Sequence, residues 1–188
     1  MIIELPNYVD TTFIDEIKSS VSSFIPKEDK HAYYRDGKSV YISQTPELQT
    51  LDDKLQNFFS SLGKNVIRPR YTPQYKSGDT GYEYHMYEPG QICHTHSDGE
   101  VASGDNPNNK AISCLRYASV VVHLNTPKDG GEIVFPAQNK KIKTEAGKVV
   151  IFPPYGMYQH YTTPSDDPRE VLVTWFVYSN VSVYVDGA

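Results

Sequence analysis

From Gly63 onward the chain consists of short stretches rich in β-branched and aromatic residues, separated by turn-forming clusters such as Lys76-Ser77-Gly78-Asp79 and Ala146-Gly147. This alternation is typical of many short β-strands. The predicted strands lie near residues 66–72, 81–88, 92–98, 111–124, 131–135, 140–143, 148–152, 157–163 and 169–178. Many short strands joined by regular turns predict a sandwich or a barrel.

Two helices are predicted ahead of these strands. Asp10 can cap the first helix and Pro26 helps to end it. The second helix is expected to have Thr45 as its side-chain cap, Pro46 at its first position and Gly63 as its stop. Apolar residues recur at helical spacing in both segments, at Phe13, Ile14, Ile17, Val21 and Phe24, and at Leu48, Leu51, Leu55, Phe58, Phe59 and Leu62. Helices that precede a run of strands are expected to pack against the outside of one sheet.

The composition is that of an ordinary globular protein. Hydrophobic residues make up 38% of the 188 residues and charged residues 22%, which argues against a disordered chain. The net charge of -5 disfavours nucleic acid as a partner, and no apolar stretch is long enough to cross a membrane. The N-terminus lacks a secretory pattern, and Cys93 and Cys114 are too few for a disulfide framework. We therefore expect a cytoplasmic protein.

The residues that point most clearly to chemistry are His96 and Asp98. Side chains two positions apart on an extended strand point to the same side, so this imidazole and this carboxylate can occupy neighbouring positions on one metal ion. With a third protein ligand they would form a facial triad, which holds ferrous iron and leaves positions open for a co-substrate and oxygen. His-x-Asp alone is common, so the interpretation depends on the third ligand.

Three histidines are candidates for the third position. His160 lies in a strand-like run near the C-terminus, and His94 alternates onto the face of His96. His123 stands in the run Val-Val-Val-His-Leu-Asn, which is typical of a buried strand. A lone histidine in such a strand is more often a hydrogen-bonded core residue than a metal ligand.

Arg169 is the candidate for binding an anion. It follows His160 by nine residues across the turn 165–168, so a hairpin would bring the two together. A period of two then places Arg169 on one strand face with Val171, Val173, Trp175 and Val177. A buried arginine among apolar residues needs an anionic partner, and the carboxylate of a ligand would serve. The alternative is an exposed arginine at the end of a strand.

Other features adjoin these residues. Cys93 precedes His96 by three positions and can line the same site, and His85 shares strand parity with Tyr87 and can lie near the pocket. Residues 99–110 form a polar loop rich in turn formers directly after Asp98. The loop is either a surface connection or a lid over the site.

An ordered set of motifs runs through roughly residues 80–178. It consists of Tyr87-Glu-Pro-Gly90, His96-Ser-Asp98, Arg116-Tyr117, His123-Leu-Asn125, Gly130-Gly131-Glu132-Ile-Val-Phe135-Pro136, Gly147, His160-x-x-x-Pro164, Arg169 and Thr174-Trp175-Phe176. In this order the motifs resemble the prolyl 4-hydroxylase group of 2-oxoglutarate- and iron(II)-dependent oxygenases.

The resemblance implies a mainly β (α+β) fold, a double-stranded β-helix or jelly roll with supporting N-terminal helices. We expect a single oxygenase domain over residues 1–188, with helical support over 1–65 and the jelly-roll core over 66–180. His96, Asp98 and His160 match the family's iron ligands. Arg169 matches the cation that pairs with the distal carboxylate of 2-oxoglutarate, and Tyr87 matches a tyrosine that lines the co-substrate pocket. His123 stands where some relatives carry a tyrosine that contacts the same carboxylate.

The activity that the resemblance implies is hydroxylation of an unactivated C–H bond, with a prolyl residue of a peptide or protein as the expected target. Small-molecule substrates are the alternative partners. Iron(II), 2-oxoglutarate and oxygen are the implied cofactor and co-substrates, and ascorbate is expected to support activity.

Two other functions fit part of the pattern. A cupin-type metalloprotein would bind its metal through His94, His96, Glu100 and His160 without 2-oxoglutarate, although the spacings are imperfect and Asp98 and Arg169 would have no role. A non-catalytic binding module could keep the same fold. Loss of an iron ligand or of the cation would favour the binding module, but His96, Asp98, His160 and Arg169 are all present.

Overall fold

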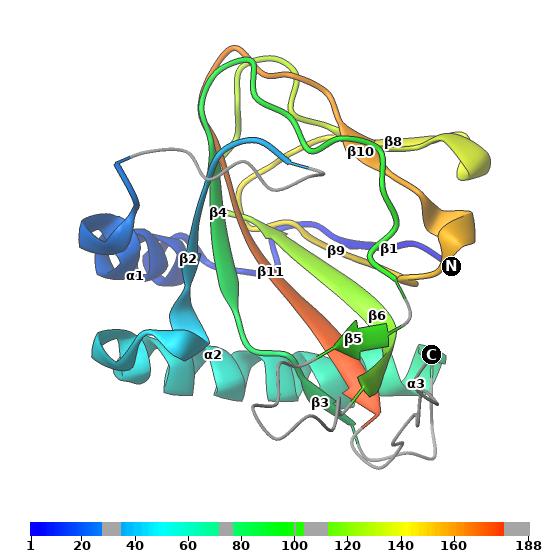
Figure 1. Ribbon diagram of the computed structural model, residues 1–188, viewed down its shortest axis with the longest axis horizontal. Helices are drawn as coiled ribbons and strands as arrows, with labels where there is room; N and C mark the ends of the chain where they lie inside the picture. The colour runs from blue at the N-terminus through cyan, green and yellow to red at the C-terminus, as the bar shows by residue number, and fades with distance from the viewer. Residues whose placement is uncertain (28–34, 72–76, 100, 104–112, 179–188) are drawn as a thin grey trace, which may run out of the picture.

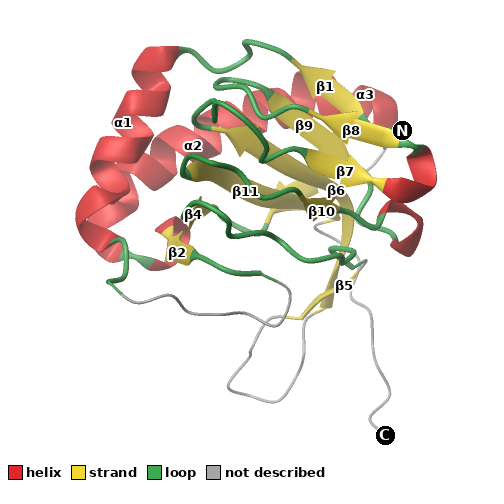
Figure 2. Cartoon of the chain, turned by 90° about the horizontal axis from the view of Figure 1, so that it is seen from above, coloured by secondary structure: helices red, strands yellow, loops and turns green. Residues whose placement is uncertain are grey.

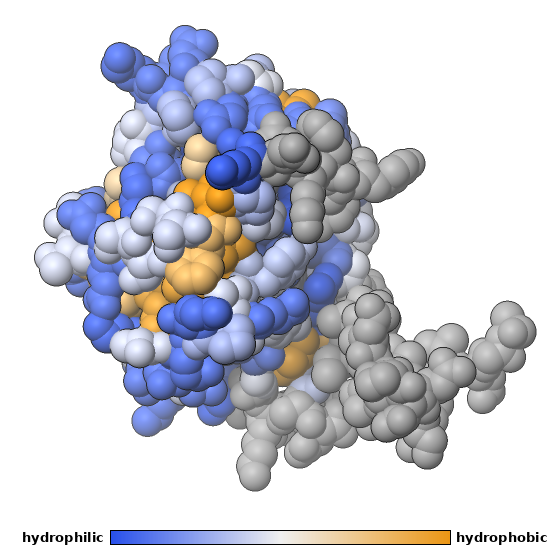
Figure 3. Space-filling model, turned by 60° about the vertical axis from the view of Figure 1, so that its left-hand side comes forward, coloured by the Kyte–Doolittle hydropathy of each residue, from blue (hydrophilic) through white to orange (hydrophobic). Residues whose placement is uncertain are grey.

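The structure of the protein is a computed structural model that describes residues 1–27, 35–71, 77–99, 101–103 and 113–178. Glu100 and most of the loop 99–110 lie outside the described residues, so the lid stays a prediction. None of the described helices has both the length and the apolar character that a membrane crossing requires. The face of the molecule in Figure 3 is mostly hydrophilic, with apolar residues gathered in a strip near its middle.

Within the described residues, eight strands form one large antiparallel sheet (Figure 1). Its strand order is β1 (Ile3–Leu5), β9 (Val149–Phe152), β6 (Ser113–His123), β11 (Arg169–Tyr178), β4 (Glu83–Tyr87) and β2 (Lys38–Tyr41). Two short strands extend it, β3 (Ser77–Asp79) beside β11 and β5 (Val101–Ser103) beside β6.

A second, smaller sheet consists of β10 (Tyr161–Thr162), β7 (Ile133–Phe135) and β8 (Lys140–Ile142). Apolar residues of this sheet and of the large sheet pack together in one core, whereas the helices lie on the other side of the large sheet (Figure 2). The fold is the predicted double-stranded β-helix with supporting helices.

Side-chain alternation along β6 and β11 divides these strands between two cores. Val120, Val122 and Leu172 pack in the core that includes the helices. Val121 and Val171 pack in the core shared with the small sheet. In the regular middle of both strands the inner face therefore carries the odd-numbered residues, and Arg169 belongs to that face, whereas Tyr117 packs in the core that includes the helices.

Helix α1 (Thr11–Val21) begins as predicted. The carboxylate of Asp10 accepts a hydrogen bond from the Phe13 amide at 2.8 Å, which satisfies one of the amides left free at a helix start. A 3₁₀ turn at Ser22–Phe24 follows the helix, and Pro26 lies just beyond it.

The second predicted helix begins one turn later than expected. Residues Pro46–Leu48 form a 3₁₀ turn, and helix α2 covers Gln49–Leu62. The Thr45 hydroxyl donates to the Tyr41 carbonyl at 2.8 Å and does not cap the turn. The prediction of Thr45 as a side-chain cap is therefore wrong.

Gly63 does not stop the helix. The chain continues through a π-helical turn, Gly63–Ile67, into helix α3 (Arg68–Tyr71), so the predicted strand 66–72 is wrong. Gly63 has helical dihedral angles, and a Cβ atom built on it would lie 2.7 Å from the Phe176 ring. This glycine allows the helical layer to approach β11 closely.

Two other predicted strands are wrong or too long. Segment 92–98 forms only isolated bridges, and segment 157–163 contains a 3₁₀ turn before the short strand β10. The remaining predicted strands are confirmed as β4, β6, β7, β8, β9 and β11, and β1, β2, β3 and β5 were not predicted. The domain boundary at residue 65 stays a prediction; β1 and β2, which precede it, pair with β9 and β4.

Candidate active site

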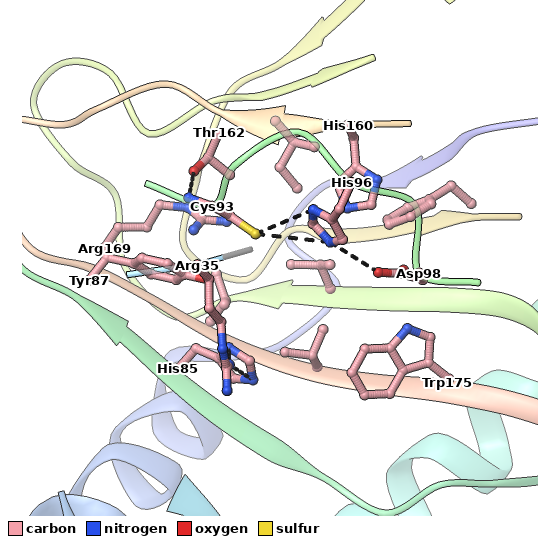
Figure 4. A pocket seen from close by; sticks show the side chains of 15 residues that line it. Arg35, His85, Tyr87, Cys93, His96, Asp98, His160, Thr162, Arg169 and Trp175 are labelled. Atoms are coloured by element: carbon pink, nitrogen blue, oxygen red, sulfur yellow. Dashed lines mark hydrogen bonds and ion pairs between the residues drawn. The ribbon is translucent and has the colours of Figure 1, made fainter. Parts of the chain in front are cut away.

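A pocket of about 520 Å³, counted with its open mouth, lies between the two sheets (Figure 4). Its lining side chains are Arg35, His85, Tyr87, Cys93, His96, Asp98, Val121, Ile133, Phe152, His160, Thr162, Arg169, Val171, Val173 and Trp175. The apolar walls come from both sheets, and the polar groups gather in two places along them.

The β11 wall follows the predicted alternation up to Trp175. Arg169, Val171, Val173 and Trp175 all line the pocket. Val177 was expected on the same face but is not among the lining residues, because the pairing of β11 with β6 shifts between Phe176 and Val177. A bulge of this kind turns the following side chains away from the regular alternation.

The first polar group unites His96, Asp98 and His160. One potential ligand atom from each residue lies within 4.8 Å of the others. His96 Nε2 is 3.3 Å from Asp98 Oδ1, and the two imidazole rings are 4.4 Å apart between centroids. His160 is buried, and the side chains of His96 and Asp98 are 15% and 8% exposed. The three residues form a partly enclosed cluster with an open side toward the pocket.

Backbone carbonyls orient both rings of this cluster. His96 Nδ1 lies 2.8 Å from the His94 carbonyl, and His160 Nδ1 lies 3.1 Å from the Tyr158 carbonyl. A carbonyl only accepts hydrogen bonds, so we infer that Nδ1 carries the proton in each ring. Nε2 is then the ring atom available to a metal ion, and at His96 such an ion would take the place of the proton that Nε2 shares with Asp98, which gives the usual arrangement around metal-binding histidines.

The electrostatics of the cluster favour a cation. Burial alone would raise the pKa of Asp98, but the His96 hydrogen bond and the nearby His160 hold that pKa well below its usual range. Burial opposes protonation of His96, yet hydrogen bonds with Asp98 and Cys93 raise its pKa to about 10. Burial lowers the pKa of His160. An ionised carboxylate beside two imidazoles is a donor set suited to ferrous iron.

The second polar group surrounds Arg169. The residue is 4% exposed, and its Cζ lies 4.9 Å from the centre of the Tyr87 ring. Among the described residues, no hydrogen-bond partner exists for Arg169 Nε or Nη1. A buried guanidinium with unsatisfied donors fits a carboxylate ligand, which can accept two parallel hydrogen bonds from it.

His123 lies behind this end of the pocket. It is fully buried, and neither ring nitrogen has a hydrogen-bond partner among the described residues. Burial and the charge of Arg169 lower its pKa well below the ordinary value, so the ring is neutral. Tyr87 lines the pocket, whereas His123 is not among the lining side chains.

Arg169 and His160 do not form the predicted hairpin. β10, which follows His160, pairs with β7 in the small sheet, and β11 pairs with β4 and β6 in the large sheet. The turn at 165–168 thus carries the chain from one sheet to the other. The two residues still meet in one pocket because the sheets face each other across it.

His94 is not part of the cluster. Its side chain is 52% exposed and lies 3.6 Å from Asp36. The alternation expected for His94 and His96 fails because segment 92–98 is not a regular strand. The cupin arrangement would need His94 at the metal, and Glu100 lies outside the described residues.

Sequence reasoning missed Arg35 and gave His85 only a neighbouring role. Both side chains line the pocket, as does Cys93, whose position was expected. Arg35 enters through a segment before β2 that carries no strand signal. No pattern in the sequence connects it with residues fifty positions further on.

The model of the 2OG-Fe(II) oxygenase superfamily matches residues 82–177, more than half of the chain. The chain therefore belongs to this superfamily and is a 2-oxoglutarate- and iron(II)-dependent dioxygenase. No curated protein sequence matches it.

Solved structures of prolyl hydroxylases share the fold. The viral collagen prolyl hydroxylase of Paramecium Bursaria Chlorella virus-1, in complex with 2-oxoglutarate, is similar with a TM-score of 0.69 and 18% identity over 95% of this chain and 96% of that chain. A Pseudomonas putida prolyl-4-hydroxylase gives 0.62 and 16% over 95% and 93%. The Trichoplax adhaerens prolyl hydroxylase, in complex with a hypoxia inducible factor peptide fragment, gives 0.64 and 15% over 94% and 83%.

Proposed function

We propose that this dioxygenase hydroxylates a prolyl residue in a peptide or protein. In this proposal His96, Asp98 and His160 hold the iron(II), and Arg169 binds the distal carboxylate of 2-oxoglutarate. Tyr87 lines the co-substrate end of the pocket, and His123, whose buried neutral ring lies close enough to feel the charge of Arg169, is the proposed second contact of the same carboxylate. Ascorbate is expected to sustain activity by keeping the iron reduced.

The observation that carries the proposal is the separation of two complementary groups within one pocket. At one end, two imidazoles and a carboxylate lie within 4.8 Å of one another. At the other end, Arg169 Nε and Nη1 have no partner among the described residues. A dicarboxylate keto-acid is matched to such a pair, because one end can chelate a metal while the other accepts from a guanidinium.

When bound, iron and 2-oxoglutarate would supply, together with oxygen, the oxidising power for hydroxylation, with succinate and carbon dioxide as the products from 2-oxoglutarate. The chain's own residues hold and orient these groups. Val121, Ile133, Phe152 and Val173 form apolar walls around the space between the two polar groups. Thus we assign no side chain to acid–base catalysis.

The choice of a prolyl substrate is the finer part of the proposal. The similar solved structures include prolyl hydroxylases, one of them with a peptide fragment bound. Their sequences are 15–18% identical to this chain, so they support the prolyl substrate through the common fold and not through sequence similarity. Trp175 adds a flat apolar wall on which a pyrrolidine ring can stack, and its buried Nε1 has no partner among the described residues.

Mass spectrometry on a panel of proline-containing peptides and free metabolites tests this function. The protein is incubated with iron(II), 2-oxoglutarate and ascorbate, and products are searched for one added oxygen atom on proline. His96→Ala should abolish the product, and His94→Ala should retain it, since His94 is exposed two positions away. Oxygen added to another residue type or metabolite, and never to proline, would reject the prolyl substrate.

A further inference from the structure

Thr162 is a buried threonine in the pocket wall whose hydroxyl hydrogen has no partner in the protein. The residue is 4% exposed and lines the pocket from β10. Its Oγ1 accepts a hydrogen bond from the Cys93 amide at 2.8 Å. A hydroxyl also has one hydrogen to donate, and the hydrogen bonds of Thr162 within the described residues include no acceptor for it. An acceptor that a ligand brings into the pocket would complete this group.

Two threonines outside the pocket donate to the protein itself. Thr163, the next residue, accepts from the Glu132 amide at 3.0 Å and donates to the Glu132 carboxylate. Thr174 donates to the Gly81 carbonyl at 2.8 Å. Neither of the two lines the pocket. Of these three threonines, only Thr162 keeps a donor for the cavity.

The small sheet places Thr162 near the stem of Arg169. Ile133 on β7 pairs with Thr162, and two positions along the same ladder the Gly131 amide donates to the Pro164 carbonyl at 3.2 Å. A Cβ atom built on Gly131 would lie 3.2 Å from Arg169 Cδ, so the arginine stem crosses the pocket wall there. Two residues of a strand span about 7 Å, which the rest of the arginine and a bound carboxylate can bridge. In Figure 4 the Arg169 side chain extends toward Thr162.

On its other side Thr162 adjoins the proposed metal ligands. His160 precedes it by two positions. Cys93, whose amide donates to Thr162, places its Sγ 3.6 Å from His96 Nδ1. Thr162 therefore stands in the pocket wall between the metal ligands and Arg169. A co-substrate that joins these two polar groups has to pass it.

A carboxylate held by Arg169 is the acceptor that suits this donor. The two oxygens of a carboxylate offer several acceptor positions, so the group can accept from a guanidinium and from a hydroxyl at the same time. In a dicarboxylic keto-acid the keto oxygen and its neighbouring carboxylate would face the metal, and the methylene groups in between accept no hydrogen bond. The distal carboxylate is then the acceptor within reach of Thr162.

We propose that the Thr162 hydroxyl donates a hydrogen bond to the distal carboxylate of 2-oxoglutarate, and so joins Arg169 and His123 in positioning this co-substrate. The inference rests on the role of Arg169 in the proposed function and adds a residue to the same end of the pocket. A keto-acid that ends in a methyl group would leave the buried hydroxyl without an acceptor, which costs binding free energy. Thr162 is thus also a determinant of which keto-acid the enzyme accepts.

The binding of two keto-acids tests the proposal. The protein is loaded with manganese(II) under argon, so that calorimetry measures binding without turnover. 2-Oxoglutarate is compared with 2-oxopentanoate, which has the same carbon chain but ends in a methyl group and is measured by competition with 2-oxoglutarate. Thr162→Val removes the hydroxyl and keeps the shape of the side chain. It should weaken 2-oxoglutarate binding roughly tenfold, the effect of losing a hydrogen bond to a charged group, and leave 2-oxopentanoate binding unchanged.

Further variants separate this role from a structural one. Thr163→Val is the matched control, because Thr163 also accepts from a backbone amide but does not line the pocket, and it should bind both keto-acids like the wild type. Thr162→Ser keeps the hydroxyl and should restore the affinity for 2-oxoglutarate. Manganese(II) affinity in the absence of a keto-acid should be the same in all three variants. Where Thr162→Val fails to fold, Thr162→Cys should show a smaller loss in the same direction, because a thiol is a weak donor.

Three results overturn the proposal. They are unchanged 2-oxoglutarate binding in Thr162→Val, an equal loss for both keto-acids, and a loss of manganese(II) affinity, which would make Thr162 a support for the segment that carries His96. Arg169→Gln, measured alongside, separates this inference from the proposed function. Weaker 2-oxoglutarate binding in Arg169→Gln but not in Thr162→Val rejects only the role of Thr162. Unchanged binding in Arg169→Gln rejects the placement of the co-substrate on which both depend.

Discussion

His96 and His160 exchange two backbone hydrogen bonds, at 3.0 Å and 2.9 Å, although they lie sixty-four positions apart in the sequence. This two-residue bridge joins the segment after β4 to the segment before β10 and sets their rings 4.4 Å apart. Two of the three proposed ligands are thus positioned by the backbone. The site is therefore preorganised: the two segments that carry these histidines are already held together before a metal ion binds.

The ligand assignment predicts that single substitutions remove metal binding but not the fold. His96→Ala, Asp98→Ala and His160→Ala should each weaken iron(II) or cobalt(II) binding by roughly 100-fold or more, because loss of a ligand exceeds the effect of losing its supporting hydrogen bond. Calorimetric titration under argon measures the affinity, and circular dichroism checks the fold. His94→Ala should bind metal like the wild type. Strong binding that survives Asp98→Ala would contradict the triad.

Arg169 is expected to govern affinity for 2-oxoglutarate. Arg169→Gln leaves the buried carboxylate without its partner and should raise the KM for 2-oxoglutarate by roughly 100-fold, about 3 kcal/mol. Arg169→Lys keeps the charge but loses the bidentate geometry, so a smaller rise is expected. Succinate formation as a function of 2-oxoglutarate concentration gives both values. An unchanged KM in Arg169→Gln would place the co-substrate elsewhere.

The sequence predicted the features that depend on local alternation. A period of two along β11 placed Arg169, Val171, Val173 and Trp175 on the pocket wall, and the β-propensity of that run identified the strand itself. The same reasoning failed for His94, because segment 92–98 makes only isolated bridges and the alternation does not hold. Periodicity predicts a face only where the strand is regular.

Other features depend on contacts between distant parts of the chain. Gly63 looks like a helix stop in the sequence, and only its closeness to Phe176 shows why a glycine stands there. Arg35 reaches the pocket through its contact with His85, fifty residues away. The predicted hairpin between His160 and Arg169 is wrong, because the strands that follow these residues belong to two different sheets. Both residues still line the pocket.

The neutral His85 predicts a specific loss of stability in acid. Its pKa is about 4 in the folded protein and about 6.5 when unfolded, so the unfolded chain binds the proton more readily as the pH falls between these values. Between pH 7 and pH 4.5 this residue should lower the free energy of unfolding by about 2.5 kcal/mol. Urea unfolding at the two pH values measures the change.

His85→Gln isolates this contribution. The variant lacks the titrating ring, so its stability should decrease less than that of the wild type over the same pH interval. His94→Gln is the matched control for the loss of an imidazole, since the His94 side chain is 52% exposed and lies outside the contact between His85 and Glu83. Equal slopes in wild type and His85→Gln would show that the ring is not held neutral.

Gly63→Ala tests whether close packing, and not a helix stop, explains the glycine. In an ordinary helix this change stabilises by about 0.5–1 kcal/mol. Here the new methyl group would meet the Phe176 ring at 2.7 Å, so we expect a loss of about 1–3 kcal/mol in the free energy of unfolding.

Gly156→Ala is the control for Gly63→Ala, because a Cβ atom there meets nothing within 4 Å, and its stability should stay within about 0.5 kcal/mol of the wild type. Adding Phe176→Leu to Gly63→Ala removes the ring that blocks the methyl group. The double variant should then be more stable than the sum of the single changes predicts, because the two substitutions relieve one shared clash. If the losses of stability in the two single variants simply add in the double variant, a clash with the Phe176 ring does not explain the effect of Gly63→Ala.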